Sequence, residues 1–132
     1  MREILFRGKI QGLTDWIYGY YAKSGENHFI LLDTDNEDNY SIVDPQTVGQ
    51  YTGLKDKNGK KIFEGDICKT YFESYTHSWE EVGVVTEFCG AYGIESADGK
   101  RFRAFINESV YTRSNEVIGN IHDNPELLKV KE

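Results

Sequence analysis

The chain has 132 residues, of which 39% are hydrophobic and 14% aromatic, so it can form one domain or two small β subdomains that share a core. Its formal net charge of −7 repels phosphate backbones and disfavours sequence-independent binding to duplex nucleic acid. No apolar run reaches the length of a signal-peptide core or a membrane span, which predicts a soluble, cytosolic protein with no membrane partner.

Short strands dominate the first part of the chain. Apolar or aromatic side chains alternate with polar or small ones, as in a half-buried antiparallel sheet. Asp44 and Pro45 then predict a single helical turn, with Asp44 as its N-cap. The expected strands are residues 3–8, 16–21, 28–32 and 40–43.

An acidic run at residues 33–39, DTDNEDN, allows two interpretations. Asp33, Asp35 and Glu37 occupy the first, third and fifth places of a calcium-binding loop. The sixth place holds Asp38 where such a loop needs glycine, and the flanking residues look like strands instead of helices. We therefore expect a solvated loop, with calcium binding as the weaker alternative.

The central stretch, residues 50–69, predicts a hairpin followed by a strand. Asn58-Gly59 lies between two hydrophobic flanks and favours a type I′ turn, which needs two positive φ values. One interpretation of Glu64 and Asp66 is a pair of carboxylates for acid–base chemistry. The favoured interpretation is a tight turn at Gly65, in which Asp66 accepts hydrogen bonds from nearby backbone amides.

The C-terminal half predicts further strands, and a second hairpin turn at Asp98-Gly99. Residues 73–79 look like an irregular polar loop, and Asn124-Pro125 begins a short C-terminal helix. The order of strands and turns resembles a small SH3-like barrel, whose closure would remove exposed sheet edges. We therefore expect a mainly β protein forming one continuous unit, in which an N-terminal antiparallel sheet (residues 1–63, including the basic hairpin) packs on an SH3-like barrel (residues 64–132).

Three blocks of sequence carry a resemblance to a known family. They are MREILFRGK at the start, QYTGLKDKNGKKIFEGDI in the middle and VIGNIHDNPELL near the end. Together they closely resemble the YopX family of small proteins encoded by bacteriophages and prophages. The resemblance implies a phage-related protein of mainly β structure in the bacterial cytoplasm. It supplies no catalytic residues, because the family has none established.

Few residues offer catalytic or metal-binding chemistry. The three histidines share no ligand spacing, and the sequence contains no phosphate-binding glycine motif and no GxSxG motif. Both cysteines are interpreted as structural thiols beside apolar strand residues. We expect no catalytic residue, no metal and no cofactor. A zinc site is the weaker alternative, and its ligands would be Cys68, His77, Cys89 and His122.

Basic hairpins are the best candidates for binding. Four lysines crowd the tip of the first hairpin, two aromatic residues at its base offer rings for stacking, and three cations surround the second hairpin. The alternative is that these charges serve solubility and edge protection. The candidate binding residues are Tyr51, Lys55, Lys57, Lys60, Lys61, Phe63, Lys100, Arg101 and Arg103.

The function expected from these features is a noncatalytic module that engages a protein partner. Nine tyrosines suit a protein interface, because their rings add contact area at small entropic cost. Three alternatives stay open: a self-assembling structural or regulatory oligomer, a single-stranded nucleic-acid binder that uses the basic hairpins, and an unrecognised enzyme with a pocket joining His77 to Asp66 or Glu64.

Overall fold

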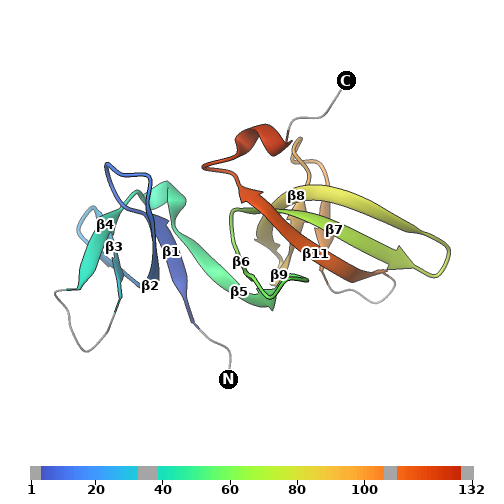
Figure 1. The fold of residues 1–132 in the computed structure, drawn as a ribbon, viewed down its shortest axis with the longest axis horizontal. Helices are drawn as coiled ribbons and strands as arrows, with labels where there is room; N and C mark the ends of the chain where they lie inside the picture. Colours follow the sequence, from blue (N-terminus) through green and yellow to red (C-terminus); the bar gives the residue numbers. More distant parts are fainter. Residues whose placement is uncertain (1–3, 33–38, 106–109, 129–132) are drawn as a thin grey trace. The chain divides into compact units, whose positions relative to one another are not determined.

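The computed structural model describes residues 4–32, 39–105 and 110–128 and confirms a mainly β protein. Its strands form two antiparallel sheets, one of six strands in the order β4-β3-β2-β1-β5-β6 and one of five in the order β10-β9-β8-β7-β11 (Figure 1). The chain divides into two compact units, Met1–Gly53 and Leu54–Glu132. The basic hairpin therefore belongs to the second unit, although the sequence placed the boundary after Phe63. No described helix is both long enough and apolar enough to span a bilayer.

The first unit is a sheet with a core on one side. Ile17, Ile30 and Val43 are buried together, since alternate residues of a strand point to the same face. Thr47, the last residue of the predicted helical turn, donates its hydroxyl to the carbonyl of Asp44 at 2.6 Å. The elements are β1 (Phe6–Lys9), β2 (Trp16–Ser24), β3 (Asn27–Leu31), β4 (Tyr40–Val43), η1 (Pro45–Thr47) and β5 (Gly49–Lys55), which continues into the second unit. The predicted strands and helical turn are thus present.

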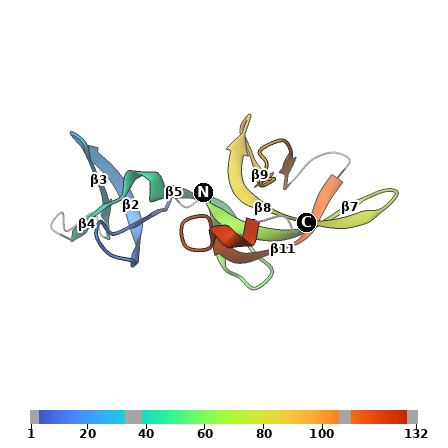
Figure 2. The same ribbon diagram turned by 90° about the horizontal axis from the view of Figure 1, so that it is seen from above.

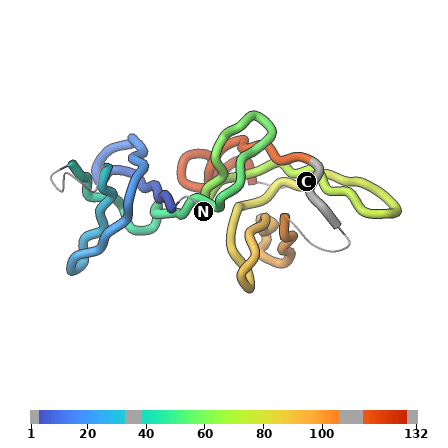
Figure 3. The backbone as a smooth tube through the Cα atoms, turned by 90° about the horizontal axis from the view of Figure 1, so that it is seen from below, coloured from blue at the N-terminus to red at the C-terminus, as the bar shows by residue number. Residues whose placement is uncertain are grey.

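The second unit contains the larger buried cluster. Phe72 and Ile62 are fully buried, and Trp79 packs against the cluster from β8. The tube drawing shows the hairpin of β7 and β8 extending past the other strands of this unit (Figure 3). The elements are β6 (Lys61–Phe63), β7 (Asp66–Ser74), β8 (Ser78–Phe88), β9 (Ala91–Glu95), β10 (Phe102–Ala104), β11 (Val110–Asn120) and η2 (Pro125–Leu128).

The barrel prediction is not confirmed, because neither sheet closes among the described residues. In the second sheet β10 lies at one edge and β11 at the other, and β11 pairs with β7 (Figure 2). The predicted C-terminal helix is also not confirmed: Pro125–Leu128 forms a 3-10 turn. The acidic run lies outside the described residues, except for Asn39.

The expected loop at residues 73–79 is mostly strand, which corrects the sequence interpretation. The ladder between β7 and β8 continues through the pairs Phe72 with Trp79 and Glu73 with Ser78. The rings of Phe72 and Trp79 stack with their centroids 5.7 Å apart. Cross-strand aromatic pairs stabilise a sheet, so this pair extends both strands into a stretch whose polar residues had indicated a loop.

Both predicted hairpins are present, but the predicted type I′ turn at the first is wrong. Gly59 has φ of 82° and Gly99 has φ of 72°, and neither Asn58 nor Asp98 has a positive φ. In each hairpin the glycine amide donates to the carbonyl three residues earlier, at 3.0 Å in the first and 2.9 Å in the second. This geometry is a type I turn followed by a left-handed glycine.

Candidate functional site

The tip of the first hairpin lies against β11 and does not project freely. The amide of Lys57 donates to the carbonyl of Asn115 at 2.9 Å. The buried carboxylate of Asp56 accepts the amides of Asn58 and Lys60 at 2.9 Å and the amide of Val117 at 3.0 Å. The hairpin therefore covers part of the outer edge of β11.

The rings at the base of this hairpin do not offer a stacking surface. Tyr51 is 5% exposed and Phe63 is 3% exposed. Both belong to strands that the sequence identified correctly, but their side chains point to the buried side. The expectation that these two rings stack on bases is therefore wrong, whereas Lys55, Lys57 and Lys60 are exposed as predicted.

Lys57→Ala should change the free energy of unfolding by less than about 0.5 kcal/mol, because exposed ion pairs contribute little. The Lys57 ammonium lies 3.5 Å from the carboxylate of Glu116, and both side chains are well exposed. Urea denaturation at low and high salt measures the change. A loss of several kcal/mol would contradict the interpretation that the hairpin is held through its backbone and Asp56.

The cations of the second hairpin converge on a carboxylate that the sequence interpretation missed. The Arg101 guanidinium lies 3.6 Å from Glu81, and Nε of Arg103 lies 3.5 Å from the same carboxylate. Glu81 is 19% exposed, while Arg101 is 67% and Arg103 37% exposed. Two guanidinium groups thus share one carboxylate, which leaves a local excess of one positive charge.

Aromatic rings lie beside this ion-pair group. The guanidinium of Arg103 lies 5.2 Å from the centre of the Trp79 ring, a cation–π distance. The exposed imidazole of His77 approaches the same indole with centroids 4.9 Å apart. Its Nδ1 lies 2.8 Å from the hydroxyl of Thr76. We call the group formed by His77, Trp79, Glu81, Arg101 and Arg103 the arginine cleft.

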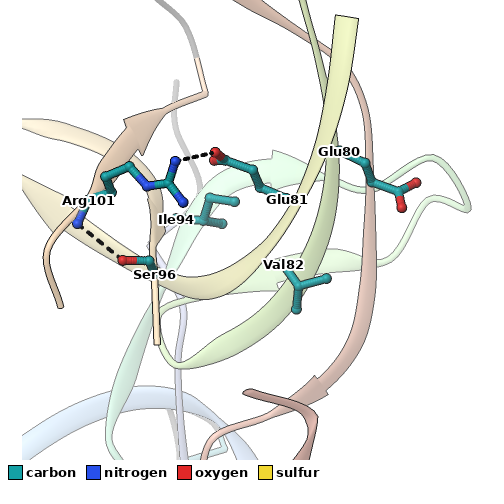
Figure 4. Close-up of a pocket in the computed structure, with 6 residues that line it drawn as sticks. All are labelled: Glu80, Glu81, Val82, Ile94, Ser96 and Arg101. Carbon is teal, nitrogen blue, oxygen red and sulfur yellow. Dashed lines mark hydrogen bonds and ion pairs between the residues drawn. The ribbon is translucent and has the colours of Figure 1, made fainter. Parts of the chain in front are cut away.

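The arginine cleft is concave. A cavity of about 430 Å³ is lined by all five of its residues together with Ser74. A second cavity of about 230 Å³ shares Glu81 and Arg101 with it (Figure 4). In Figure 4 the side chain of Arg101 points toward Glu81, over Ile94. The cleft therefore combines an aromatic wall with guanidinium donors, an arrangement that can hold an anionic group beside an apolar one.

The two basic clusters line different surfaces. Lys100 lines a third cavity of about 350 Å³ with Arg101, Phe88 and Phe102. No lysine of the first hairpin lines this cavity or the arginine cleft. Of the predicted binding residues, the structure thus brings together Arg101 and Arg103. Trp79 and Glu81 are two residues apart, so in a strand their side chains share one face. The interpretation of residues 73–79 as a loop hid this relation.

The described residues do not bring together the side chains that the catalytic and metal alternatives require. His77 shares its cavity with Glu81 and not with Glu64 or Asp66. Asp66 is buried and accepts the amide of Phe63 at 2.8 Å, which confirms its predicted role in the turn. Within the described residues, no three His, Cys, Asp or Glu side chains are grouped to hold a metal ion.

The two cysteines differ. Cys68 is a buried thiol in the core, as predicted. Cys89 is exposed and has φ of 52° in the turn before β9, so the expectation of a second buried thiol is wrong. Gly90 follows in a left-handed conformation, and the chain reverses there before β9.

Comparison with known protein families gives a match over residues 8–129 to the family described as YopX protein. This match covers nearly the whole chain and includes both hairpins and the arginine cleft. No curated protein matches the chain.

Proposed function

This chain belongs to the YopX family, and from that premise we propose that it is a noncatalytic module that binds a protein partner through the arginine cleft. The observation that carries the proposal is the stacking of Arg103 on Trp79 inside a concave site. Tryptophan and arginine are enriched among the residues that dominate the energetics of protein interfaces. The proposed setting is a bacterial cytoplasm in which a phage or prophage encodes the protein.

The scaffold of the cleft supports this role. Trp79 is anchored against Phe72 in the core, so its ring has a fixed position. Arg103 is held between Glu81 and the indole, and Arg101 is mostly exposed. Side chains that are already ordered lose less conformational entropy when a partner binds, which favours affinity.

Affinity capture from phage-infected or lysogenic cells, followed by mass spectrometry, tests the proposal. The double variant Arg101→Ala/Arg103→Ala should lose the partner that the natural chain captures. The matched control, Lys55→Ala/Lys60→Ala, removes the same charge from the first hairpin and should retain that partner. A partner lost only with the lysines, or retained by both variants, would contradict a role for the cleft.

Self-association is the second candidate function, because the first unit has exposed apolar side chains. Tyr20 and Tyr40 are each about half exposed. The ring of Tyr40 contacts Phe29 edge to face at 5.3 Å, beside a cavity of about 280 Å³ that Ala22 and Leu31 also line. Sedimentation over a range of concentrations tests this candidate, and a monomer throughout would remove it.

Binding of single-stranded nucleic acid through the basic hairpins has less support. Such binding uses exposed rings beside cations, whereas Tyr51 and Phe63 are buried. The net charge of −7 also disfavours a polyanion.

A further inference from the structure

The arginine cleft has the features of a site for a carboxylate. The contacts between Glu81 and the two guanidinium groups are 3.5 to 3.6 Å long. Charge-assisted hydrogen bonds between such groups are typically about 2.7–2.9 Å, so both contacts to Glu81 are longer than those of a strong ion pair. A guanidinium has five N–H donors, and the contacts to Glu81 use Nη1 of Arg101 and Nε of Arg103.

The aromatic wall of the cleft also contains a buried donor without a partner. The indole Nε1 of Trp79 is buried, and among the described residues it has no hydrogen-bond partner. Buried polar groups in folded proteins are nearly always satisfied, by protein atoms, water or a ligand. Trp79 lines the larger cavity together with both arginines, so one incoming group can meet the arginines and the aromatic wall together.

We propose that the arginine cleft recognises a carboxylate side chain of the partner that lies next to an apolar side chain. The carboxylate takes the guanidinium donors of Arg101 and Arg103 in competition with Glu81. The apolar neighbour packs against the rings of His77 and Trp79. This inference rests on the proposed function and names the chemistry that the partner presents.

The opposing charges favour a local and specific contact over long-range attraction. Glu80, which lines the smaller cavity, lies 3.5 Å from Lys69, and the whole chain carries −7. An acidic partner is therefore not steered by the overall field. It is held at short range, where the two arginines outnumber Glu81.

Titration with two blocked peptides tests the inference. The probes are N-acetylated, C-amidated Gly-Glu-Phe-Gly and its counterpart Gly-Gln-Phe-Gly, added to the full ¹⁵N-labelled chain. The readout is the indole N–H resonance of Trp79, assigned as the one that Trp16→Phe leaves in place. We expect a saturable shift with the Glu peptide and roughly tenfold weaker binding of the Gln peptide, as for loss of a charged hydrogen-bond partner. Equal binding of the two peptides, or no shift with either, overturns the inference.

Variants separate recognition from a structural role of the ion pairs. Glu81→Gln removes the internal competitor and should raise the affinity for the Glu peptide roughly tenfold, whereas Arg101→Ala should lower it by a similar factor. The control Glu116→Gln removes an ion-paired carboxylate elsewhere in this unit and should leave the affinity unchanged. Unchanged or lower affinity in a folded Glu81→Gln protein overturns the inference. Arg101 is mostly exposed, so its truncation keeps the test valid if Glu81→Gln does not fold.

Inorganic phosphate distinguishes a free anion from a protein carboxylate. Phosphate that binds more tightly than the Glu peptide assigns the cleft to a small anion and overturns the inference. Cellular capture that depends on Arg101 and Arg103, without peptide binding, leaves the proposed function in place and removes this inference alone. Peptide binding without any captured partner leaves the carboxylate recognition in place and removes the proposed function in the cell.

Discussion

Asp56→Asn is expected to lower the free energy of unfolding by about 3 kcal/mol at neutral pH, the cost of disrupting hydrogen bonds to a buried charged group. One carboxylate oxygen accepts the amides of Asn58 and Lys60, and the other accepts the amide of Val117. Asparagine keeps a single oxygen acceptor, so its NH₂ group would face at least one backbone N–H. The variant therefore leaves a donor unsatisfied where the hairpin meets β11.

Asp98→Asn is the matched control, and it should shift the midpoint of urea denaturation far less. Asp98 lies in the turn of the second hairpin, directly before its glycine as Asn58 does in the first, and accepts the amide of Lys100 at 3.0 Å. It is exposed, and it also accepts a hydrogen bond from the nearby hydroxyl of Ser96. Equal shifts for the two variants would show that the contact with Val117 contributes nothing.

The effect of Asp56 should also depend on pH. Burial raises the pKa of Asp56, but the amides of Val117, Lys60 and Asn58 outweigh it and hold the pKa below its usual range. A carboxylate with a lowered pKa stabilises the fold above its unfolded-state pKa of about 3.9, and this contribution is lost as the pH falls through the native pKa. Denaturation midpoints of the natural chain and Asp56→Asn should therefore differ at pH 7 and converge below about pH 4. A difference between the two midpoints that grew at acidic pH would contradict the stabilising role of the Asp56 carboxylate.

The same carboxylate explains why the turn type was not predictable from the sequence. Asn58-Gly59 marked the position of the reversal correctly, because Gly59 supplies the positive φ. Asp56 also bonds amides two and four residues later, which favours a longer loop built on a type I turn. Its third bond, to Val117, joins residues 61 positions apart, and no local pattern contains that information.

The alternating pattern likewise predicted which residues form strands better than it predicted which strands pair in the sheets. Alternation of apolar and polar residues identified most strands, since the pattern reports which face of a strand is buried. Strand order depends on contacts between distant residues. β11 pairs with β7 across two register shifts, at Thr112/Ser114 and Val117/Gly119, and the sheet stays open. The predicted barrel required a closing pair that the alternation does not encode.

Only part of the arginine cleft was predictable from the sequence, because the rest depends on strand order. Arg101 and Arg103 were identified from their charge and their place after a hairpin turn. Glu81 and Trp79 come from β8, which lies on the other side of β9 from β10, and no local pattern predicts that strand order. A charge cluster in sequence therefore became a paired and partly neutral group in space.

Gly93→Ala should reduce stability by about 3 kcal/mol, in the upper range for overpacking a close contact, and should also disrupt the arginine cleft. Gly93 lies on β9 between Thr86 and Ala104. A Cβ atom there would lie 2.0 Å from the carbonyl oxygen of Arg103 and 2.7 Å from Cα of Ala104. Both are backbone atoms, so β10 has to move, and Arg103 moves with it away from Glu81 and Trp79.

Gly90→Ala is the control, because a Cβ at Gly90 meets nothing within 4 Å and the substitution is opposed only by the positive φ of 84°. It should cost about 1 kcal/mol, the usual penalty of a left-handed alanine. Thermal denaturation gives the stability of each variant, and the near-ultraviolet circular dichroism of Trp79 in a Trp16→Phe background reports the cleft. If Gly93→Ala were as stable as Gly90→Ala and kept the Trp79 signal, β10 would not depend on the absence of a side chain at residue 93. The close approach of β9 to β10 would then not be what holds Arg103 over the indole.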